Sequence, residues 1–75
     1  MDNHFIAVVA LDGVTALDLA IPMDVFGIDP DVPYELRVCG VTDRVQTASG
    51  LTLAIDHGLE AVAEADTVIV PGYEP

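Results

Sequence analysis

The sequence predicts an α/β fold, a three-layer sandwich around a parallel sheet of which only the N-terminal half is present. Residues 5–11 and 67–70 are runs of apolar or β-branched residues, a pattern typical of parallel strands that are covered on both faces. Between these runs, apolar residues recur at helical spacing over residues 16–26. The second run leads into Pro71-Gly72, and ligands in open parallel sheets gather just beyond such strand ends. We therefore expect residues 1–75 to be the opening part of a larger domain.

The first strand is followed by a helix and then by a more exposed strand. Thr15 is placed to cap the helix, and Asp18 stands three residues later in the capping-box position. Because proline removes a backbone hydrogen bond, Pro22 predicts a bent helix or one whose regular part begins there, and Gly27 is expected to end it. Residues 34–39 alternate between apolar and polar, which predicts a strand nearer the edge of the sheet.

The second half of the sequence predicts a small hairpin and a short helix. Residues 45–47 and 51–55 are β-type segments around Ser49-Gly50, which suits a hairpin turn. Asp56 is placed to cap a helix over residues 58–65. Strands buried on both faces need helices on both sides of the sheet, and the chain supplies one full helix and one short one. The remaining cover must come from further sequence or a partner, so we expect the isolated chain to be poorly folded or self-associated.

The composition limits the covalent and membrane chemistry that the chain can support. It contains one cysteine, so it forms no internal disulfide, and its few Cys and His residues do not make a structural zinc site. Hydrophobic residues make up 52% of the chain but occur in runs too short to span a bilayer. The first residues lack the basic stretch of a secretory signal. These features predict a cytoplasmic protein.

The net charge excludes two classes of partner for this segment. It is −11, and Arg37 and Arg44 are the only Lys or Arg residues. Binding to nucleic acid or to an anionic membrane requires clustered basic residues, so we expect neither contact here. The sequence contains neither a GxGxxG motif nor a P-loop, which leaves nucleotide binding without support. We expect no cofactor and no metal.

Asp12-Gly13, followed by the helix LDLAIPMDVFG over residues 17–27, resembles the first βα unit of the DJ-1/PfpI superfamily. This superfamily has a class I glutamine amidotransferase-like, flavodoxin-type fold. Further segments resemble its second strand, its small hairpin, the start of its next helix and its third core strand, and these are residues 34–39, 45–53, 56–59 and 63–72. The resemblance covers nearly the whole chain. It implies a three-layer, flavodoxin-like parallel sheet, with residues 1–75 forming a partial domain.

Within the superfamily, the helix and the last strand look most like bacterial AraC-type transcriptional regulators. The resemblance implies an N-terminal fragment of a sensor domain that binds a small effector, acts in a homodimer and contacts DNA only through a separate C-terminal module. An alternative is a cysteine enzyme of the isonitrile hydratase or amidase type, whose nucleophile would lie beyond residue 75. It is therefore uncertain from the sequence whether the protein is an enzyme, and a truncated reading frame without activity of its own is a third interpretation.

Four residues are candidates for a site. The resemblance aligns Asp18 with an acidic residue that points at the cysteine of the enzymes, so Asp18 is a candidate for ligand binding and catalysis; the alternative is first-turn helix capping. Asp12 and Gly13 form the turn after the first strand, at the edge where ligands bind. Gly72 lies in a loop whose amides help to form an oxyanion-binding spot in the superfamily.

Three other reactive residue types are expected to have structural roles. Cys39 lies inside a predicted strand and is expected to be a small buried apolar residue. His57, beside Asp56, is expected to be an exposed imidazole next to a helix cap. Asp24 is expected to be a solvated helix residue.

Overall fold

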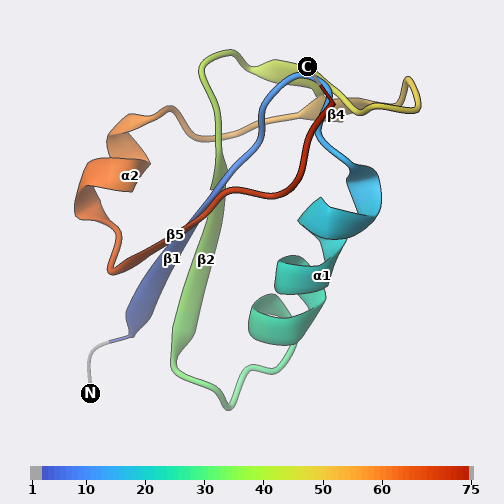
Figure 1. Cartoon of the computed structure of the whole chain (residues 1–75). Coiled ribbons are helices and arrows are strands. Elements are labelled where there is room, and N and C mark those ends of the chain that lie inside the picture. Colours follow the sequence, from blue (N-terminus) through green and yellow to red (C-terminus); the bar gives the residue numbers. More distant parts are fainter. Residues whose placement is uncertain (1–2, 75) are drawn as a thin grey trace.

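A computed structural model describes residues 3–74 and confirms the α/β fold (Figure 1). Its elements, in chain order, are β1 (His4–Val9), α1 (Ala16–Gly27), β2 (Tyr34–Cys39), β3 (Arg44–Gln46), β4 (Thr52–Ala54), α2 (Glu60–Glu64) and β5 (Thr67–Ile69). The order of strands and helices is the one that the sequence predicts. Most strand ends differ from the predicted ones by one or two residues.

The main sheet is parallel and has β1 in its centre. The strand order is β2-β1-β5, with β1 paired to β2 from His4 opposite Tyr34 to Val9 opposite Cys39. On its other side, Ile6 lies opposite Thr67. β2 therefore lies at an edge of this sheet, as its alternating pattern predicts. The hairpin β3–β4 is a separate antiparallel pair, with Val45 opposite Leu53.

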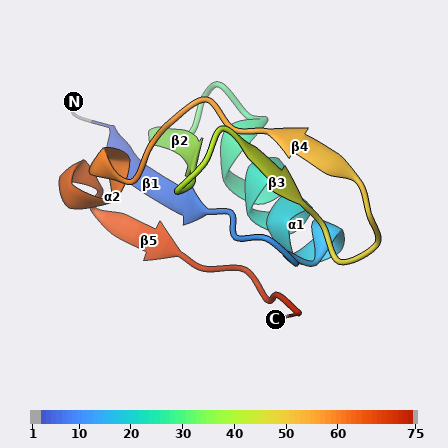
Figure 2. The same ribbon diagram turned by 90° about the horizontal axis from the view of Figure 1, so that it is seen from above.

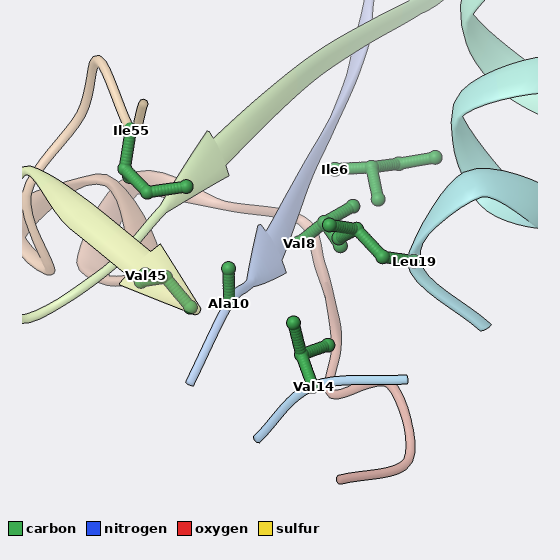
Figure 3. Packing of buried hydrophobic residues seen from close by; sticks show 7 residues of the cluster. All are labelled: Ile6, Val8, Ala10, Val14, Leu19, Val45 and Ile55. Carbon is green, nitrogen blue, oxygen red and sulfur yellow. The ribbon is translucent and has the colours of Figure 1, made fainter. Parts of the chain in front are cut away.

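Alternate residues of β1 enter two different cores. Ile6 and Val8 pack with Leu19 of α1 and with Val45 and Ile55 near the hairpin (Figure 3). On the opposite face, Phe5 and Ala7 pack with Cys39 of β2 and Ala61 of α2. Seen from above, α1 and α2 lie on opposite sides of the sheet (Figure 2). The period-2 alternation of β1 therefore places one helix on each face.

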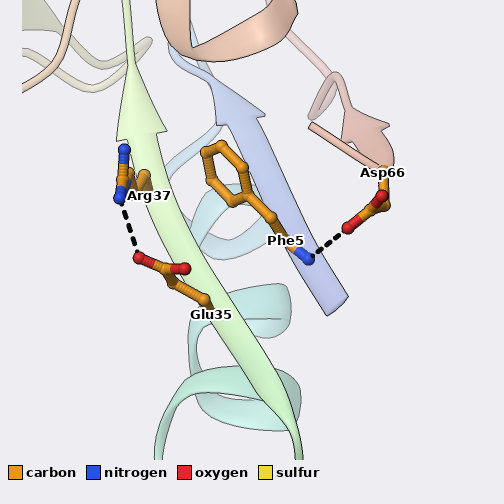
Figure 4. Close-up of polar contacts among 4 residues, drawn as sticks. All are labelled: Phe5, Glu35, Arg37 and Asp66. Atoms are coloured by element: carbon orange, nitrogen blue, oxygen red, sulfur yellow. Dashed lines mark hydrogen bonds and ion pairs between the residues drawn. The ribbon is translucent and has the colours of Figure 1, made fainter. Parts of the chain in front are cut away.

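Polar contacts fix the start of β5 beside β1. The Asp66 carboxylate accepts a hydrogen bond from the Phe5 amide at 2.8 Å, and the Asp66 amide donates to the Phe5 carbonyl at 2.9 Å (Figure 4). The Phe5 ring is covered by the Arg37 guanidinium, 4.8 Å from the ring centre. Arg37 also pairs with Glu35 on the same strand, at 2.8 Å.

α1 runs from Ala16 through Pro22 to Gly27, so it begins and ends where the sequence predicts. Of the two interpretations of Pro22, a helix whose regular part begins at that residue is excluded. Pro22 is buried, so packing against the sheet offsets the hydrogen bond that proline removes. The prediction that Asp56 caps the second helix was wrong. α2 begins at Glu60 with Leu59 as its N-cap, which leaves Asp56 outside the first turn.

The last strand, β5, is only partly covered by the residues that the structure describes. Val68 and Val70 are 43% and 57% exposed, because α1 and α2 cover β1 and leave the outer side of β5 open. The total accessible surface of the chain, 4854 Å², is larger than the roughly 4,400 Å² that a compact monomer of this mass exposes. In residues 3–74, no helix has both the length and the apolar character needed to cross a membrane.

Candidate ligand site at the carboxyl edge of the sheet

The loop that follows β1 lies between two other segments of the chain. The Gly13 amide donates to the Gln46 carbonyl at 2.8 Å, and the Gly13 carbonyl accepts from the Glu74 amide at 2.8 Å. Val14, the next residue, is fully buried and forms bridges to both Thr47 and Tyr73. The hairpin and the segment after β5 are therefore held together at the carboxyl edge of the sheet.

Gly13 has the backbone conformation and the space that only glycine provides. Its φ is +87°, in the left-handed region, and a Cβ at this position would overlap the carbonyl group of Glu74. The close approach of the Glu74 backbone therefore explains why glycine occupies position 13. Its neighbour Asp12 accepts a hydrogen bond through Oδ1 from the Gln46 amide at 3.0 Å, which ties the turn to β3.

Asp18 and Gly72 lie next to each other where the start of α1 meets the segment that follows β5. Asp18 is exposed in the first turn of α1, and its Oδ2 would be 2.6 Å from a Cβ placed on Gly72. The backbone fixes this approach, because the Thr15 amide at the start of α1 donates to the Gly72 carbonyl at 2.8 Å. Thr15 itself makes no side-chain capping bond. The arrangement places an exposed carboxylate beside a glycine backbone, where the carboxylate can accept hydrogen bonds.

A pocket of about 230 Å³ opens at the ends of β1 and β2. It is lined by Ala10, Leu11, Asp12, Val41, Thr42 and Val45. Of the four candidate residues, only Asp12 lines it; Asp18 and Gly72 belong to the other side of the loop. The sequence analysis missed Val41 and Thr42. They lie two and three residues beyond the end of the second strand, and that position beyond a parallel strand was the signal that could have found them.

Cys39 is confirmed as a buried residue. Its side chain has no exposed surface, and its thiol lies 3.7 Å from the Val8 carbonyl oxygen. Burial, and then the negative charge of Glu60, raise the pKa of the Cys39 thiol above its usual range. A reactive cysteine needs a stabilised thiolate, so Cys39 is not suited to act as a nucleophile.

His57 has an exposed side chain, as predicted, and its backbone extends the edge of β2. Its carbonyl oxygen accepts a hydrogen bond from the Gly40 amide at 3.0 Å. Over residues 3–74, no group of three or more His, Cys, Asp or Glu side chains is arranged to hold a metal ion.

Comparison with known proteins finds similarity in fold. No family model and no curated protein matches the chain. The solved VC2308 protein matches with a TM-score of 0.70 and 22% identity, over 95% of this chain and 37% of that chain. An AraC family transcriptional regulator from Pseudomonas putida matches with a TM-score of 0.59 and 20% identity, over 95% of this chain and 41% of that chain. The chain thus spans about two fifths of either solved chain, and at these identities the likeness concerns the fold. The resemblance to the DJ-1/PfpI superfamily stays a prediction.

Proposed function

We propose that residues 1–75 are the N-terminal part of a DJ-1/PfpI-like sensor domain in an AraC-type transcriptional regulator, and that they contribute to binding a small effector. The observation that carries the proposal is the fold match to an AraC family regulator over 95% of this chain. The match covers 41% of that regulator, which leaves room for the rest of a sensor domain and for a DNA-binding module. The resemblance of the helix over residues 17–27 points to the same class.

The open side of β5 supports the view that these residues belong to a larger sheet. β5 pairs with β1 on one side, and the side chains of Val68 in β5 and Val70 just after it are 43% and 57% exposed. Exposed apolar strands at a sheet edge invite pairing with a further strand. Further strands beside β5, together with the helices that connect them, would cover these side chains and complete the three layers.

The carboxyl edge suggests how an effector would bind. The pocket beside Asp12 is mainly apolar, and its volume of about 230 Å³ is below the roughly 300 Å³ at which ligand pockets begin, so it would hold part of an effector. Asp12 and Thr42 supply polar groups at its wall. Asp18 and Gly72 would contact a ligand from the other side of the loop. We propose an effector with a small apolar body and at least one hydrogen-bond donor.

In this proposal, effector and DNA bind to different parts of a cytoplasmic homodimer. A net charge of −11 makes residues 1–75 unsuited to phosphate contacts, so DNA would be held by a basic module elsewhere in the regulator. The effector would act by binding one conformation of the dimer more tightly than another.

The position of Asp18 beside Gly72 also favours a second candidate function, a cysteine enzyme of the isonitrile hydratase or amidase type. Asp18 would then hold or exchange a proton with a cysteine and its substrate. Because Cys39 is buried and its pKa is raised, the nucleophile would have to come from another part of the protein.

Determining the coding sequence that adjoins codon 75 distinguishes the two functions. The regulator predicts further strands followed by a basic helical module with two helix-turn-helix motifs. A cysteine on a sharp strand-to-helix turn, with no basic helical module after it, would instead identify the enzyme.

A further inference from the structure

β2 pairs with β1 on one side, and its other side is open over most of its length. The carbonyls of Pro33, just before β2, and of Cys39, its last residue, accept hydrogen bonds at 2.7 and 2.9 Å from amides at the start of β1 and just after it. Backbone groups alternate in direction along a strand, so residues 35 and 37 also face β1 and the residues between them face away. Within residues 3–74, no strand pairs with this outer side. The outward N–H and C=O groups belong to Tyr34, Leu36 and Val38.

His57 marks where the open side of β2 ends. The Gly40 amide, the next outward group along the chain, donates to the His57 carbonyl at 3.0 Å, and Cys39 forms a bridge to His57. The part of the edge that is free for a partner is therefore residues 34–38, which we call the open edge.

The open edge carries two opposite charges on one face. Glu35 and Arg37 form an ion pair at 2.8 Å (Figure 4). Arg37 is one of only two Lys or Arg residues in a chain of net charge −11, so the open edge is locally neutral in an acidic protein. Like charges on an edge strand oppose pairing with another strand, whereas opposite charges that lie across from each other stabilise it.

The spacing of the two charges selects one register for a second copy of β2. In an antiparallel pair with a two-fold axis at Leu36, Glu35 of each copy lies opposite Arg37 of the other. The backbone groups of Leu36 then bond with those of Leu36 of the second copy, and Tyr34 lies opposite Val38. An axis at Glu35 or at Arg37 would instead place identical charges opposite each other. The open edge is therefore self-complementary, as a two-fold interface requires.

Further strands of the same domain are better placed beside β5 than beside β2. Val68 of β5 is apolar and 43% exposed, whereas β2 carries the charged pair on one face. Strands inside a parallel sheet are nearly uniformly apolar. In addition, the main sheet has its second, first and third strands in that order, as in flavodoxin-like sheets, where the second strand ends the sheet. We therefore expect β2 to remain an edge in the whole domain.

We propose that β2 of one copy pairs antiparallel with β2 of a second copy about a two-fold axis at Leu36, which joins the two sheets. The inference rests on the homodimer of the proposed function and specifies one of its surfaces. Cross-strand neighbours share a face of the sheet, so both copies of α1 lie on the same face of the joined sheet. The pairing therefore leaves room for a further contact between copies through the exposed apolar residues of α1, which are Leu17, Ile21 and Val25.

The first test reverses the two charges one at a time in the intact protein. E35R places an arginine opposite Arg37 of the second copy, and R37E places a glutamate opposite Glu35. Each variant should self-associate at least about tenfold more weakly than the wild type in sedimentation, whereas the double variant E35R/R37E should associate like the wild type. Each single variant keeps two like charges within its own strand, but a mixture of the two places opposite charges across the axis. Native mass spectrometry of the equimolar mixture should therefore show mixed dimers well above the statistical proportion.

The pair D43R and R44E is the matched control. Asp43 and Arg44 are exposed, lie outside the open edge and undergo the same changes of charge. Both control variants should associate like the wild type and mix in the statistical proportion, and circular dichroism checks that every variant is folded. Unchanged association of E35R and R37E, or a mixture of the two without excess mixed dimers, would refute the proposal. A dimer held only through another surface would give that result and would leave the proposed homodimer standing.

Amide hydrogen exchange distinguishes a second copy from a further strand of the same chain. In the wild type, the outward amide of Leu36 should be protected, and it should lose protection in E35R at the same protein concentration. The Arg37 amide, which faces β1, should stay protected in both. A Leu36 amide that is protected in both proteins would mean that the same chain covers β2, and one that is unprotected in the wild type would mean that nothing does. Either result would overturn the proposal.

Discussion

The carboxylate of Asp18 lies against Gly72, so close that a Cβ on Gly72 would be 2.6 Å from Asp18 Oδ2. The two residues are far apart in the sequence, and the hydrogen bond from the Thr15 amide to the Gly72 carbonyl brings them together. The absence of a side chain at position 72 therefore creates the space that the carboxylate occupies. This contact joins the start of α1 to the segment after β5 at the edge where ligands of parallel sheets bind.

We expect Gly72→Ala to displace the Asp18 carboxylate and leave the fold intact. The backbone of Gly72 is outside the left-handed region, so alanine adds no backbone strain, and the atom it meets ends an exposed side chain. The loss of stability should be below about 1 kcal/mol. A double-mutant cycle with Asp18→Ala measures the coupling, because the cost of Gly72→Ala should vanish when the carboxylate is absent. A cost that is unchanged in the Asp18→Ala background would contradict the contact.

Gly13→Ala should be far more damaging than the same change at Gly50. Both glycines have positive φ, which makes a non-glycine residue unfavourable by roughly 1–2 kcal/mol. At Gly13 the new Cβ would also overlap backbone atoms of Glu74, whereas at Gly50 it would meet nothing within 4 Å. Amide hydrogen exchange should show loss of protection at Gly13 and Glu74 only in the Gly13 variant. Similar exchange in both variants would mean that the loop and the C-terminal segment are not held together.

In the intact regulator, Asp18→Ala should weaken the response to effector while protein levels stay unchanged. Asp18 is exposed and makes no contact that the core depends on, so its removal should affect stability by at most about 1 kcal/mol through the helix dipole. Asp24→Ala, which removes an exposed carboxylate from the same helix, is the matched control. A promoter-reporter assay measures the response. An unchanged response in the Asp18 variant would remove Asp18 from the site.

Cys39 should react slowly with alkylating reagents, and its burial should make the folded chain less stable at high pH. Burial and the charge of Glu60 raise the pKa of its thiol in the folded chain, so the folded state holds the proton more tightly than the unfolded state. This contribution is fully present below the ordinary thiol pKa of about 8.5 and is lost as the pH rises through the higher folded pKa. The rate at which iodoacetamide labels Cys39 near neutral pH should match the rate at which the chain unfolds or opens locally around Cys39. Labelling as fast as for a free thiol would show that Cys39 is accessible.

Local patterns were sufficient to predict most of the fold. The uniformly apolar run at β1 predicted a parallel strand that is covered on both faces, and its alternate residues do pack on two faces. The alternation in residues 34–39 placed β2 at an edge, and Ser49-Gly50 marked the hairpin turn. These signals succeed because side-chain direction in a strand and the demands of a turn are set by near neighbours.

Features that depend on distant contacts were not predictable from the sequence. The apolar spacing of α1 could not decide which side packs on the sheet, because Leu17, Ile21 and Val25 are as apolar as Leu19 and Phe26. The pocket joins Leu11 to Val41, and the approach of Gly72 to Asp18 joins opposite ends of the chain. The Asp56 cap failed because its helix begins later than its sequence pattern suggests.

Scanning calorimetry of the 75-residue chain over a range of concentrations tests the central claim, that these residues are one part of a larger sheet. Since Val68 and Val70 at β5 and Leu17, Ile21 and Val25 of α1 are exposed, we expect a melting temperature that rises with protein concentration. A sharp transition that is independent of concentration, with equal calorimetric and van't Hoff enthalpies, would show a self-sufficient monomer and would contradict the account.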